Sequence, residues 1–424
     1  MTDVCLILEG TYPYIVGGVS TWVHALIGGL PQFDFSLVHL TARDKRERIK
    51  FDLPPNLREI VVVEIDGYQR PYQIARWKPG PLRLPQARAY HALSTGFAGL
   101  LAGQIKEQNG LPFILTEHAI YWREIADGAT EVECGFQVIR QTGRAEIAAL
   151  RRHWTSTFRQ LARLAYAQAD AIVTVCEANR RLQLEEGADP AKCSVIPNGV
   201  PADALAATRV PFANGRPRIG LVGRVVPIKD VETFIRAAHL LTARLPEAEF
   251  VIVGPTDQDA AYYCHCRRLA KELGLNGRLT FTGELPPQEC YAGLDALALT
   301  SRSEAQPLTV LEAMSAGRPV VVTDVGACRE MVEGGAQTDR ALGPAGLVTP
   351  PQHPQATAEA VLALCRDPQM AAQMGRAGQR RVRAFYRQER CLDEYNRLYE
   401  RLLVPRLGVT LPASRDAEPA DRLI

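Results

Sequence analysis

The chain has 424 residues, which is too long for one ordinary hydrophobic core and predicts two domains. Hydrophobic residues make up 46% of it and charged residues 23%, as in soluble globular proteins. The net charge of +2 gives no electrostatic reason to expect a nucleic-acid partner, and no apolar stretch is long enough to cross a bilayer. The cysteines form no Cys-x-x-Cys pair, which is typical of reduced thiols in a cytoplasmic protein.

Short apolar runs alternate with amphipathic segments along the first half of the chain, a pattern that predicts a parallel sheet with crossover helices. Strands are predicted at Val4–Leu8, Ser36–Leu40, Ile60–Ile65, Phe113–Thr116, Ala171–Val175 and Ser194–Ile196. Helices are predicted at Val19–Leu30, Ala87–Glu107 and Glu146–Gln168. The basic run Arg43–Lys50 is interpreted as a solvated loop, with a membrane-contacting patch as the alternative.

The same pattern restarts after a Pro- and Ala-rich stretch, Pro201–Pro217, which is interpreted as a linker. Strands are predicted at Ile219–Val222, Phe250–Val253, Leu279–Phe281, Ala296–Leu299, Val320–Thr323 and Gly346–Val348. A last amphipathic helix is predicted at Ala384–Leu403, followed by a polar tail from Gly408 that is predicted to be disordered. The expected fold class is α/β, with two doubly wound domains that bind ligands at the carboxyl ends of their strands.

In each half, the segment that follows the first predicted strand has features suited to phosphate binding. Gly17 and Gly18 precede the first helix, where backbone amides at a helix N-terminus can approach an anion. Gly223-Arg224-Val-Val-Pro-Ile-Lys229 places two cations around a proline turn, and both could point at one anion. Two fixed cations beside a leaving diphosphate would stabilise its charge. A glycine pair in an ordinary turn and a pair of surface cations are the alternatives.

Two carboxylates, Glu304 and Glu312, are separated by seven residues that include Pro307. If Pro307 opens a helix, Glu304 lies in the preceding loop and Glu312 near the second turn. One carboxylate can then face a group at the helix N-terminus while the other reaches the next group of the same ligand, an arrangement that suits a sugar joined to a nucleotide. A loop glutamate and a solvated helix glutamate are the alternative. His118, at the end of a predicted strand, is compatible with a functional or a structural role.

Taken in chain order, these segments resemble the retaining glycosyltransferases of family 4, which have the GT-B architecture. The resemblance rests on Glu304-x7-Glu312 with Ala-Met-Ser-Ala-Gly-Arg-Pro-Val after it, on Gly223-Arg-Val-Val-Pro-Ile-Lys229-Asp, and on Val195-Ile-Pro-Asn-Gly199. The segment Leu8-Glu-Gly-Thr-Tyr-Pro-Tyr-x-x-Gly-Gly-Val-Ser-x-Trp22 resembles the PelF branch of exopolysaccharide glycosyltransferases, as do Glu304-x-Gln-Pro-Leu308 and Asp324-Val-Gly-Ala-Cys-Arg-Glu330.

The resemblance implies two Rossmann-like domains that face each other across a cleft. It assigns residues 1–205 to an acceptor-side N-terminal domain and residues 218–383 to a C-terminal domain that binds the nucleotide sugar. The C-terminal helix at 384–404 is expected to pack back toward the N-terminal domain, before the tail at 408–424.

The resemblance also implies roles for the matching residues. Arg224 and Lys229 would hold the diphosphate with Gly17, Gly18 and Gly223, and Glu312 would bind the ribose hydroxyls. The donor sugar would be held by Glu304 and the segment after it, and His118 would approach the bond that breaks. That segment consists of Gln306, Pro307, Leu308 and Thr309. Neither a metal nor a cofactor is expected. Ala305 and Ala119 stand where many relatives have Gly, and their methyl groups restrict backbone with positive φ.

The implied activity is metal-independent transfer, with retention, of a hexosyl group from UDP-glucose or a related UDP-hexose to a growing polysaccharide or glycoconjugate. The acceptor, a saccharide or a lipid-linked sugar, would contact Tyr12–Tyr14 and Tyr121–Glu124. The protein is expected in the cytoplasm, where it could associate with an inner-membrane polysaccharide synthase complex. A nucleotide-sugar 2-epimerase of the same fold and a catalytically silent scaffold subunit are the alternatives, and an assay without acceptor distinguishes the epimerase.

Overall fold

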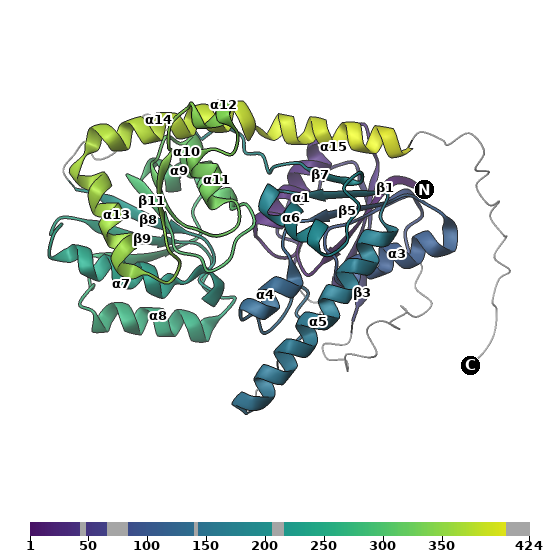
Figure 1. Cartoon of the computed structure of the whole chain (residues 1–424), viewed down its shortest axis with the longest axis horizontal. Helices are drawn as coiled ribbons and strands as arrows, with labels where there is room; N and C mark the ends of the chain where they lie inside the picture. Colours follow the sequence, from purple (N-terminus) through teal and green to yellow (C-terminus); the bar gives the residue numbers. More distant parts are fainter. Residues whose placement is uncertain (43–47, 66–83, 140–142, 206–215, 404–424) are drawn as a thin grey trace.

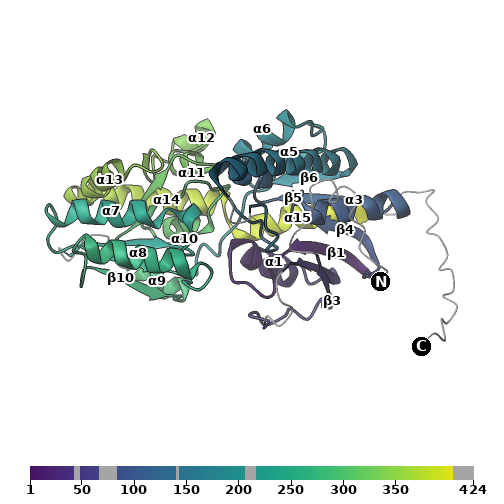
Figure 2. The same ribbon diagram turned by 90° about the horizontal axis from the view of Figure 1, so that it is seen from below.

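The computed structural model describes residues 1–42, 48–65, 84–139, 143–205 and 216–403. They form two parallel sheets that lie side by side along the long axis of the molecule, each between layers of helices (Figures 1 and 2). This is the predicted α/β architecture of two Rossmann-like domains. The tail from Gly408 and much of the predicted linker and of the basic run lie outside the described residues.

The first half contains a seven-stranded sheet in the order β3-β2-β1-β4-β5-β6-β7, with parallel pairing throughout. Its strands are β1 (Thr2–Glu9), β2 (Phe35–Thr41), β3 (Leu57–Glu64), β4 (Ala87–Ala92), β5 (Phe113–Glu117), β6 (Ala171–Thr174) and β7 (Cys193–Val195). Its helices are α1 (Gly18–Gly29), α3 (Phe97–Asn109), α4 (Tyr121–Asp127), α5 (Arg144–Gln168) and α6 (Glu177–Glu185). Two buried apolar clusters fill the faces of the sheet, one beneath α3 and α5 and the other beneath α1.

The prediction of a helix over Ala87–Glu107 was wrong in its first part, because residues Ala87–Ala92 form strand β4. Alanine favours helices in isolation, but β4 pairs with β1 and β5 in the middle of the sheet and is buried on both faces. Small side chains fit such a position, so packing overrides the local preference. The helix proper, α3, begins at Phe97.

The second half contains a six-stranded parallel sheet in the order β10-β9-β8-β11-β12-β13. Its strands, all at predicted positions, are β8 (Arg218–Val222), β9 (Glu249–Val253), β10 (Leu279–Gly283), β11 (Ala296–Leu299), β12 (Val320–Thr323) and β13 (Gly346–Thr349). Its helices are the 3-10 turn η1 (Pro227–Lys229), α7 (Val231–Thr242), α8 (Ala260–Glu272), α9 (Pro287–Ala292), α10 (Leu308–Ser315), α11 (Cys328–Glu333), α12 (Gln337–Arg340), α13 (Pro354–Arg366) and α14 (Pro368–Phe385). In both halves the strand order reverses beside the first strand, and ligands of such sheets bind at that point.

The last helix, α15 (Gln388–Leu403), runs from the second half over the first half (Figure 1). The predicted start at Ala384 was wrong, because Ala384 belongs to α14 and the helical structure is interrupted at Tyr386 and Arg387. The break has a backbone cause: the Val200 amide donates to the Tyr386 carbonyl at 3.0 Å, and the Gln388 amide donates to the Val200 carbonyl at 3.0 Å. These bonds replace part of the helical ladder.

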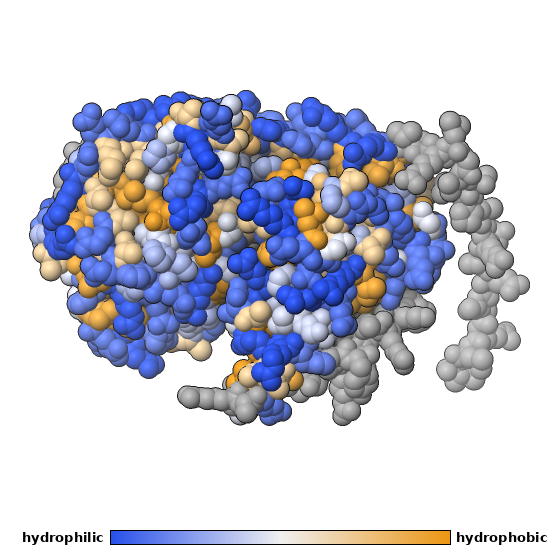
Figure 3. Space-filling view, in the orientation of Figure 1, coloured by the Kyte–Doolittle hydropathy of each residue, from blue (hydrophilic) through white to orange (hydrophobic). Residues whose placement is uncertain are grey.

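Side chains of α15 enter the core of the first half. Tyr399 Oη lies 2.8 Å from His91 Nδ1, His91 Nε2 lies 2.7 Å from Thr116 Oγ1, and Thr116 Oγ1 lies 3.0 Å from Tyr395 Oη. This buried polar chain fixes α15 on strands β4 and β5. The outer side of α14 and α15 is largely hydrophilic (Figure 3). Within the described residues, no helix has both the length and the apolar character that a membrane crossing requires.

Candidate active site

The loop between β11 and α10 carries the two glutamates as the sequence predicted. Pro307 occupies the N-cap position, α10 begins at Leu308, and Glu304 lies in the loop before it. Glu312 falls in the second turn of α10. Because Pro307 cannot donate a backbone hydrogen bond and has its φ fixed, it suits the position where the helix starts. The N-terminal end of α10, with its unpaired amides, therefore lies beside Glu304.

Glu304 forms an ion pair with Lys229, whose Nζ lies 2.5 Å from Glu304 Oε1. Ser301 Oγ donates to the same carboxylate oxygen at 2.6 Å. The two charged side chains are only 18% and 11% exposed, so their mutual attraction is screened less than that of a surface pair. Lys229 comes from η1, five residues after Arg224. In such a pair, the cation can bind an anion and the carboxylate can accept hydrogen bonds from hydroxyl groups.

Arg224 lies in the same loop after β8, where its Nη1 donates to Gln258 Oε1 at 3.2 Å. Gly223 has φ +152°, a conformation that side chains disfavour, and a Cβ there would lie 3.7 Å from Cε of Lys229. Glycine therefore lets the chain turn sharply from the strand end into the segment that carries both cations. Arg224 and Lys229 both lie after the carboxyl end of β8.

The N-terminus of α1 meets this region from the first half. Gly17 is the N-cap of α1, with extended backbone at φ −178°, and no atom lies within 4 Å of a Cβ built on it. A Cβ on Gly18 would lie 3.8 Å from Leu308 Cδ1, so the first turns of α1 and α10 lie close together. The N-terminus of a helix favours an anion near it.

His118 follows β5 and is buried behind the ring of Trp22, with ring centroids 4.5 Å apart in an edge-on arrangement. Burial lowers its pKa to about 4, so the imidazole is neutral near pH 7. Its Nε2 is buried and has no hydrogen-bond partner among the described residues. A neutral imidazole of this kind can exchange a hydrogen bond with a sugar hydroxyl, but it does not supply charge.

The remaining predicted residues are not all in one pocket. Glu312 Oε2 accepts from Tyr291 Oη at 2.6 Å; burial raises the pKa of Glu312, and this hydrogen bond opposes the rise. Glu312 is one of the residues that line a pocket formed by α1, α10, α15 and the segment Gly199–Pro201. Gln306 contacts Asn198 of the first half. Its side-chain Oε1 accepts from the Asn198 backbone amide at 2.6 Å, and its backbone carbonyl accepts from Asn198 Nδ2 at 3.1 Å. These two hydrogen bonds of Gln306 therefore connect the two halves. Thr309 Oγ1 is buried and has no hydrogen-bond partner among the described residues.

A pocket between the two halves, here called the cleft pocket, contains groups that the sequence did not single out. The first half contributes Ala119, Ile120, Arg123, Glu124 and Asn179, and the second half contributes Arg302, Ser303, Glu304, Ala305, Val325 and Gly326. Ala119 and Ala305, the two alanines that the sequence analysis names, line this pocket from opposite halves. The sequence contains one signal for Asn179 as a residue of the pocket: it lies shortly after a predicted strand, because α6 follows β6 closely.

The comparisons with protein families divide the chain in the same way as the sheets do. Residues 216–367 match the family described as glycosyl transferases group 1. Residues 2–80 and 77–191 match a family described as a domain of unknown function, DUF3492.

Curated relatives include two D-inositol 3-phosphate glycosyltransferases. That of Nocardia farcinica is 33% identical over 184 residues, which cover 40% of this chain and 41% of that protein. That of Rhodococcus jostii is 30% identical over 308 residues, which cover 68% of this chain and 60% of that protein. The chain therefore spans less than two thirds of the length of these relatives.

Solved structures match over nearly the whole chain. Sucrose-phosphate synthase from Thermosynechococcus elongatus superposes with a TM-score of 0.72 at 20% identity, covering 95% of this chain and 99% of that one. Anabaena Alr3699/HepE, solved in complex with UDP and glucose, superposes with a TM-score of 0.68 at 15% identity, covering 94% and 100%. The chain therefore has the GT-B fold, and residues 216–367 of its second half match the family described as glycosyl transferases group 1.

Proposed function

We propose that the protein is a retaining glycosyltransferase that moves a hexosyl group from UDP-glucose or a related UDP-hexose to a hydroxyl of a saccharide or lipid-linked acceptor. The observation that carries the proposal is the ion pair of Lys229 with Glu304, which lies in the loop before α10, while Arg224 lies in the same loop as Lys229 and α1 begins close to Leu308 of α10. This arrangement offers positive potential for a diphosphate next to a carboxylate for sugar hydroxyls. The relatives named glycosyltransferases and the neighbour solved with UDP and glucose support the same class of donor.

In the proposed reaction, the bond between the anomeric carbon and the β-phosphate oxygen breaks while the acceptor oxygen approaches from the same face. The acceptor proton passes to the departing phosphate. Arg224 and Lys229 stabilise the charge that the diphosphate gains, and the two helix N-termini add to this field. We propose that these groups neutralise the diphosphate without a divalent ion. Neutral His118 positions the sugar through a hydrogen bond, and Glu312 binds the ribose.

We assign the enzyme to exopolysaccharide synthesis of the PelF type, working in the cytoplasm beside an inner-membrane synthase. The support is the segment from Leu8 to Trp22, whose residues resemble that branch. It forms the end of β1, the loop that contains Gly17, and the first turn of α1.

A thermal-shift screen of UDP-, GDP- and ADP-sugars, run in a chelator, tests the donor. We expect one UDP-hexose to raise the melting temperature selectively, since a ligand that binds the native state stabilises it. Nuclear magnetic resonance of the product then reports whether the anomeric configuration is retained. A screen in which no nucleotide sugar stabilises the protein contradicts the proposal. So does the appearance of an epimerised nucleotide sugar in the absence of acceptor.

A further inference from the structure

We infer that Tyr291 of α9 is a positioning residue for the nucleotide: its hydroxyl fixes the Glu312 carboxylate for the ribose, so that the enzyme selects a ribonucleotide over a 2′-deoxyribonucleotide. The inference rests on the proposed function, in which Glu312 binds the ribose, and it adds a residue and a sugar selectivity to that site. The ligand class is a nucleoside diphosphate that carries both ribose hydroxyls.

The first argument is the place of Glu312 along α10. Glu312 and Leu308 are four residues apart, so they lie on the same face of the helix, and both line the pocket formed by α1, α10, α15 and the segment Gly199–Pro201. One helical turn rises about 5.4 Å, which is roughly how far Glu312 lies along the helix from the amides at its start. The diphosphate is proposed to bind at those amides, and a ribose is joined to it through one carbon atom. The ribose hydroxyls can therefore reach this carboxylate.

The second argument is the hydrogen bond that holds the carboxylate. Tyr291 Oη donates to Glu312 Oε2 at 2.6 Å, and within the part of the chain that the structure describes no other hydrogen bond reaches this carboxylate. Tyr291 is 1% exposed, whereas Glu312 is half-buried and lines the pocket. An ionised carboxylate has about four acceptor sites, so it can accept from Tyr291 and still accept from two ribose hydroxyls.

The third argument is that Tyr291 is itself held in place. Its ring belongs to the buried cluster that also contains Val310 and Leu311 of α10. Its backbone carbonyl accepts from Nε of the buried Arg318 at 3.0 Å, and the Arg318 amide donates to the Ala313 carbonyl of α10 at 2.9 Å. Tyr291 is thus joined to α10 through its side chain and through its backbone. A binding group that is fixed in advance loses little freedom when its ligand arrives.

Tyr291 also favours the charged form of Glu312. Burial raises the pKa of Tyr291 well above its usual value, so the phenol keeps its proton and acts as a donor. Burial raises the pKa of Glu312 as well, and the hydrogen bond from Tyr291 opposes that rise. Hydrogen bonds to an ionised carboxylate are roughly twice as strong as bonds between neutral groups. Loss of the Tyr291 hydroxyl would therefore weaken the binding of both ribose hydroxyls.

The experiment is titration calorimetry with UDP and with 2′-deoxy-UDP, which gives the ratio of the two affinities. We expect the wild type to bind UDP at least about tenfold more tightly, because the deoxy compound leaves a hydrogen bond of the carboxylate unmade. In Tyr291→Phe the ratio should fall to about threefold or less, since the carboxylate loses both its donor and its fixed orientation. Phenylalanine keeps the ring in the core, so the change is confined to one hydroxyl.

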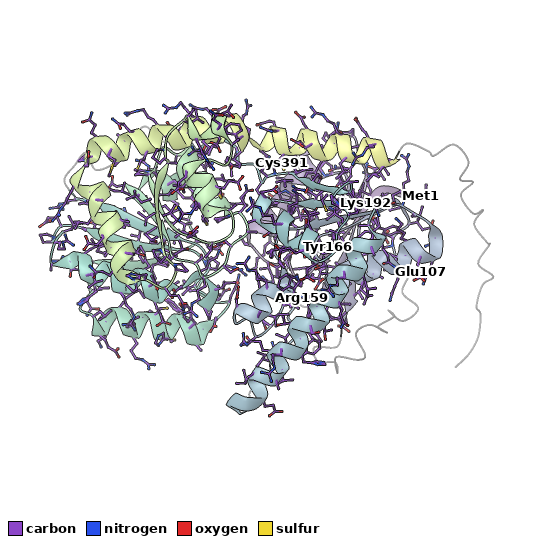
Figure 4. All side chains as sticks on the ribbon, in the orientation of Figure 1. Met1, Glu107, Arg159, Tyr166, Lys192 and Cys391 are labelled. Carbon is purple, nitrogen blue, oxygen red and sulfur yellow. The ribbon has the colours of Figure 1, made fainter. Side chains whose placement is uncertain are left out.

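Tyr166→Phe is the matched control. Tyr166, labelled in Figure 4 on α5, donates to Glu117 Oε2 at 2.6 Å, which is the same kind of bond at the same length in the first half. This variant should keep the wild-type ratio. Glu312→Gln should lower the ratio as Tyr291→Phe does, and the double variant should have the same ratio as Glu312→Gln alone, because both changes act on one group.

A purely structural role of Tyr291 would weaken the binding of both nucleotides equally, so an unchanged ratio in Tyr291→Phe overturns the inference. A double variant whose ratio differs from that of Glu312→Gln also overturns it. The double variant has no carboxylate left without a donor, so it provides the test even if Tyr291→Phe alone does not fold. A wild type that binds the two nucleotides equally overturns the inference as well, whereas one that binds neither overturns the proposed function.

Discussion

At the scale of single residues, Lys229 has a carboxylate partner with which a bound diphosphate would compete. In the structure it pairs with Glu304, and both side chains are largely buried. A diphosphate beside Lys229 would share its charge and leave the Glu304 carboxylate free to accept hydrogen bonds from sugar hydroxyls. The ion pair thus keeps both groups charged and in place before the donor binds. The net gain in folding stability from such a pair can be small, because both charges lose hydration.

Replacing Lys229 by alanine should lower turnover about a hundredfold, or roughly 3 kcal/mol, because a charge that stabilises the leaving group is lost. Affinity for the donor should fall less than turnover, and steady-state kinetics measures both. The variant also leaves Glu304 without its cation, so the melting temperature should drop. Lys229→Ala combined with Glu304→Gln should recover the melting temperature but not the turnover. Undiminished turnover in the single variant would remove Lys229 from the mechanism.

The acceptor KM should depend on pH through Glu124, which belongs to the segment Tyr121–Glu124 that the resemblance assigns to the acceptor. Burial raises its pKa to about 8, so the carboxyl is neutral below that pH and charged above it. Once charged it can no longer donate to a sugar hydroxyl, and it repels Glu304. The KM of a methyl glycoside that serves as acceptor should therefore rise above about pH 8 in the wild type. Glu124→Gln cannot ionise, so its KM should stay level over the same range. An equal alkaline rise in both proteins would place the titration elsewhere.

The spacing of residues predicted which side chains stand near each strand end, but not which of them meet across the cleft. Glu304 and Glu312 lie where the proline and the spacing placed them. Gln306 is only two residues from Glu304, yet its side chain binds Asn198 from the first half. Asn179 faces the same pocket as Glu304 for an equally non-local reason. Contacts of this kind depend on how the two halves are arranged, and sequence periodicity carries no information about that.

At the scale of elements, the neighbouring N-termini of α1 and α10 form part of the proposed anion site. Gly17 tests it well, because its extended backbone tolerates any residue and the space beside it is open. Gly17→Ala should keep the melting temperature, since no described atom obstructs the methyl group. It should weaken UDP binding at least several-fold if phosphate oxygens come close to the amides there.

Gly143→Ala is the matched control for this substitution. Gly143 is the N-cap of α5, it has open space around it, and it is not one of the residues that line the cleft pocket. Calorimetry with UDP on both variants measures the difference. Equal UDP affinity in the two variants would show that α1 does not take part in binding the diphosphate.

Elements were predicted best where one face or both faces of a strand are clearly apolar. Every strand of the second sheet stands where its apolar run predicted it. The two failures, at Ala87–Ala92 and at Ala384, have tertiary causes. Residues Ala87–Ala92 form a strand because they pair with β1 and β5 in the middle of the sheet. The last helix begins at Gln388 and not at Ala384, because Val200 bonds to the backbone of Tyr386 and Gln388 between α14 and α15.

At the scale of the whole molecule, buried carboxyls make folding stability depend on pH. Burial raises the pKa of Glu9 to about 7, although Ala98 and Ser94 donate hydrogen bonds to it. An unfolded chain releases this proton near pH 4.5. The folded state therefore holds more protons between about pH 4.5 and 7, and the contribution of Glu9 to stability falls as pH rises through that window.

Glu9→Gln removes the charge at nearly constant shape. Its melting temperature relative to the wild type should increase between pH 5 and pH 8, corresponding to at most roughly 3 kcal/mol. The difference between the two proteins cancels the titration of buried histidines such as His91, whose pKa burial lowers to about 3. Differential scanning calorimetry at several pH values measures it. A constant difference would mean that Glu9 ionises in the folded protein as it does in water.

The proposed donor site involves both halves: a nucleotide diphosphate would bind between them, neutralised by Arg224, Lys229 and two helix N-termini. Titration calorimetry of UDP-glucose in excess chelator tests it most directly. We predict saturable binding at one site in the wild type, unchanged by the chelator and lost in the double variant Arg224→Ala, Lys229→Ala. Binding that requires added magnesium or manganese, or that persists in the double variant, would contradict the account.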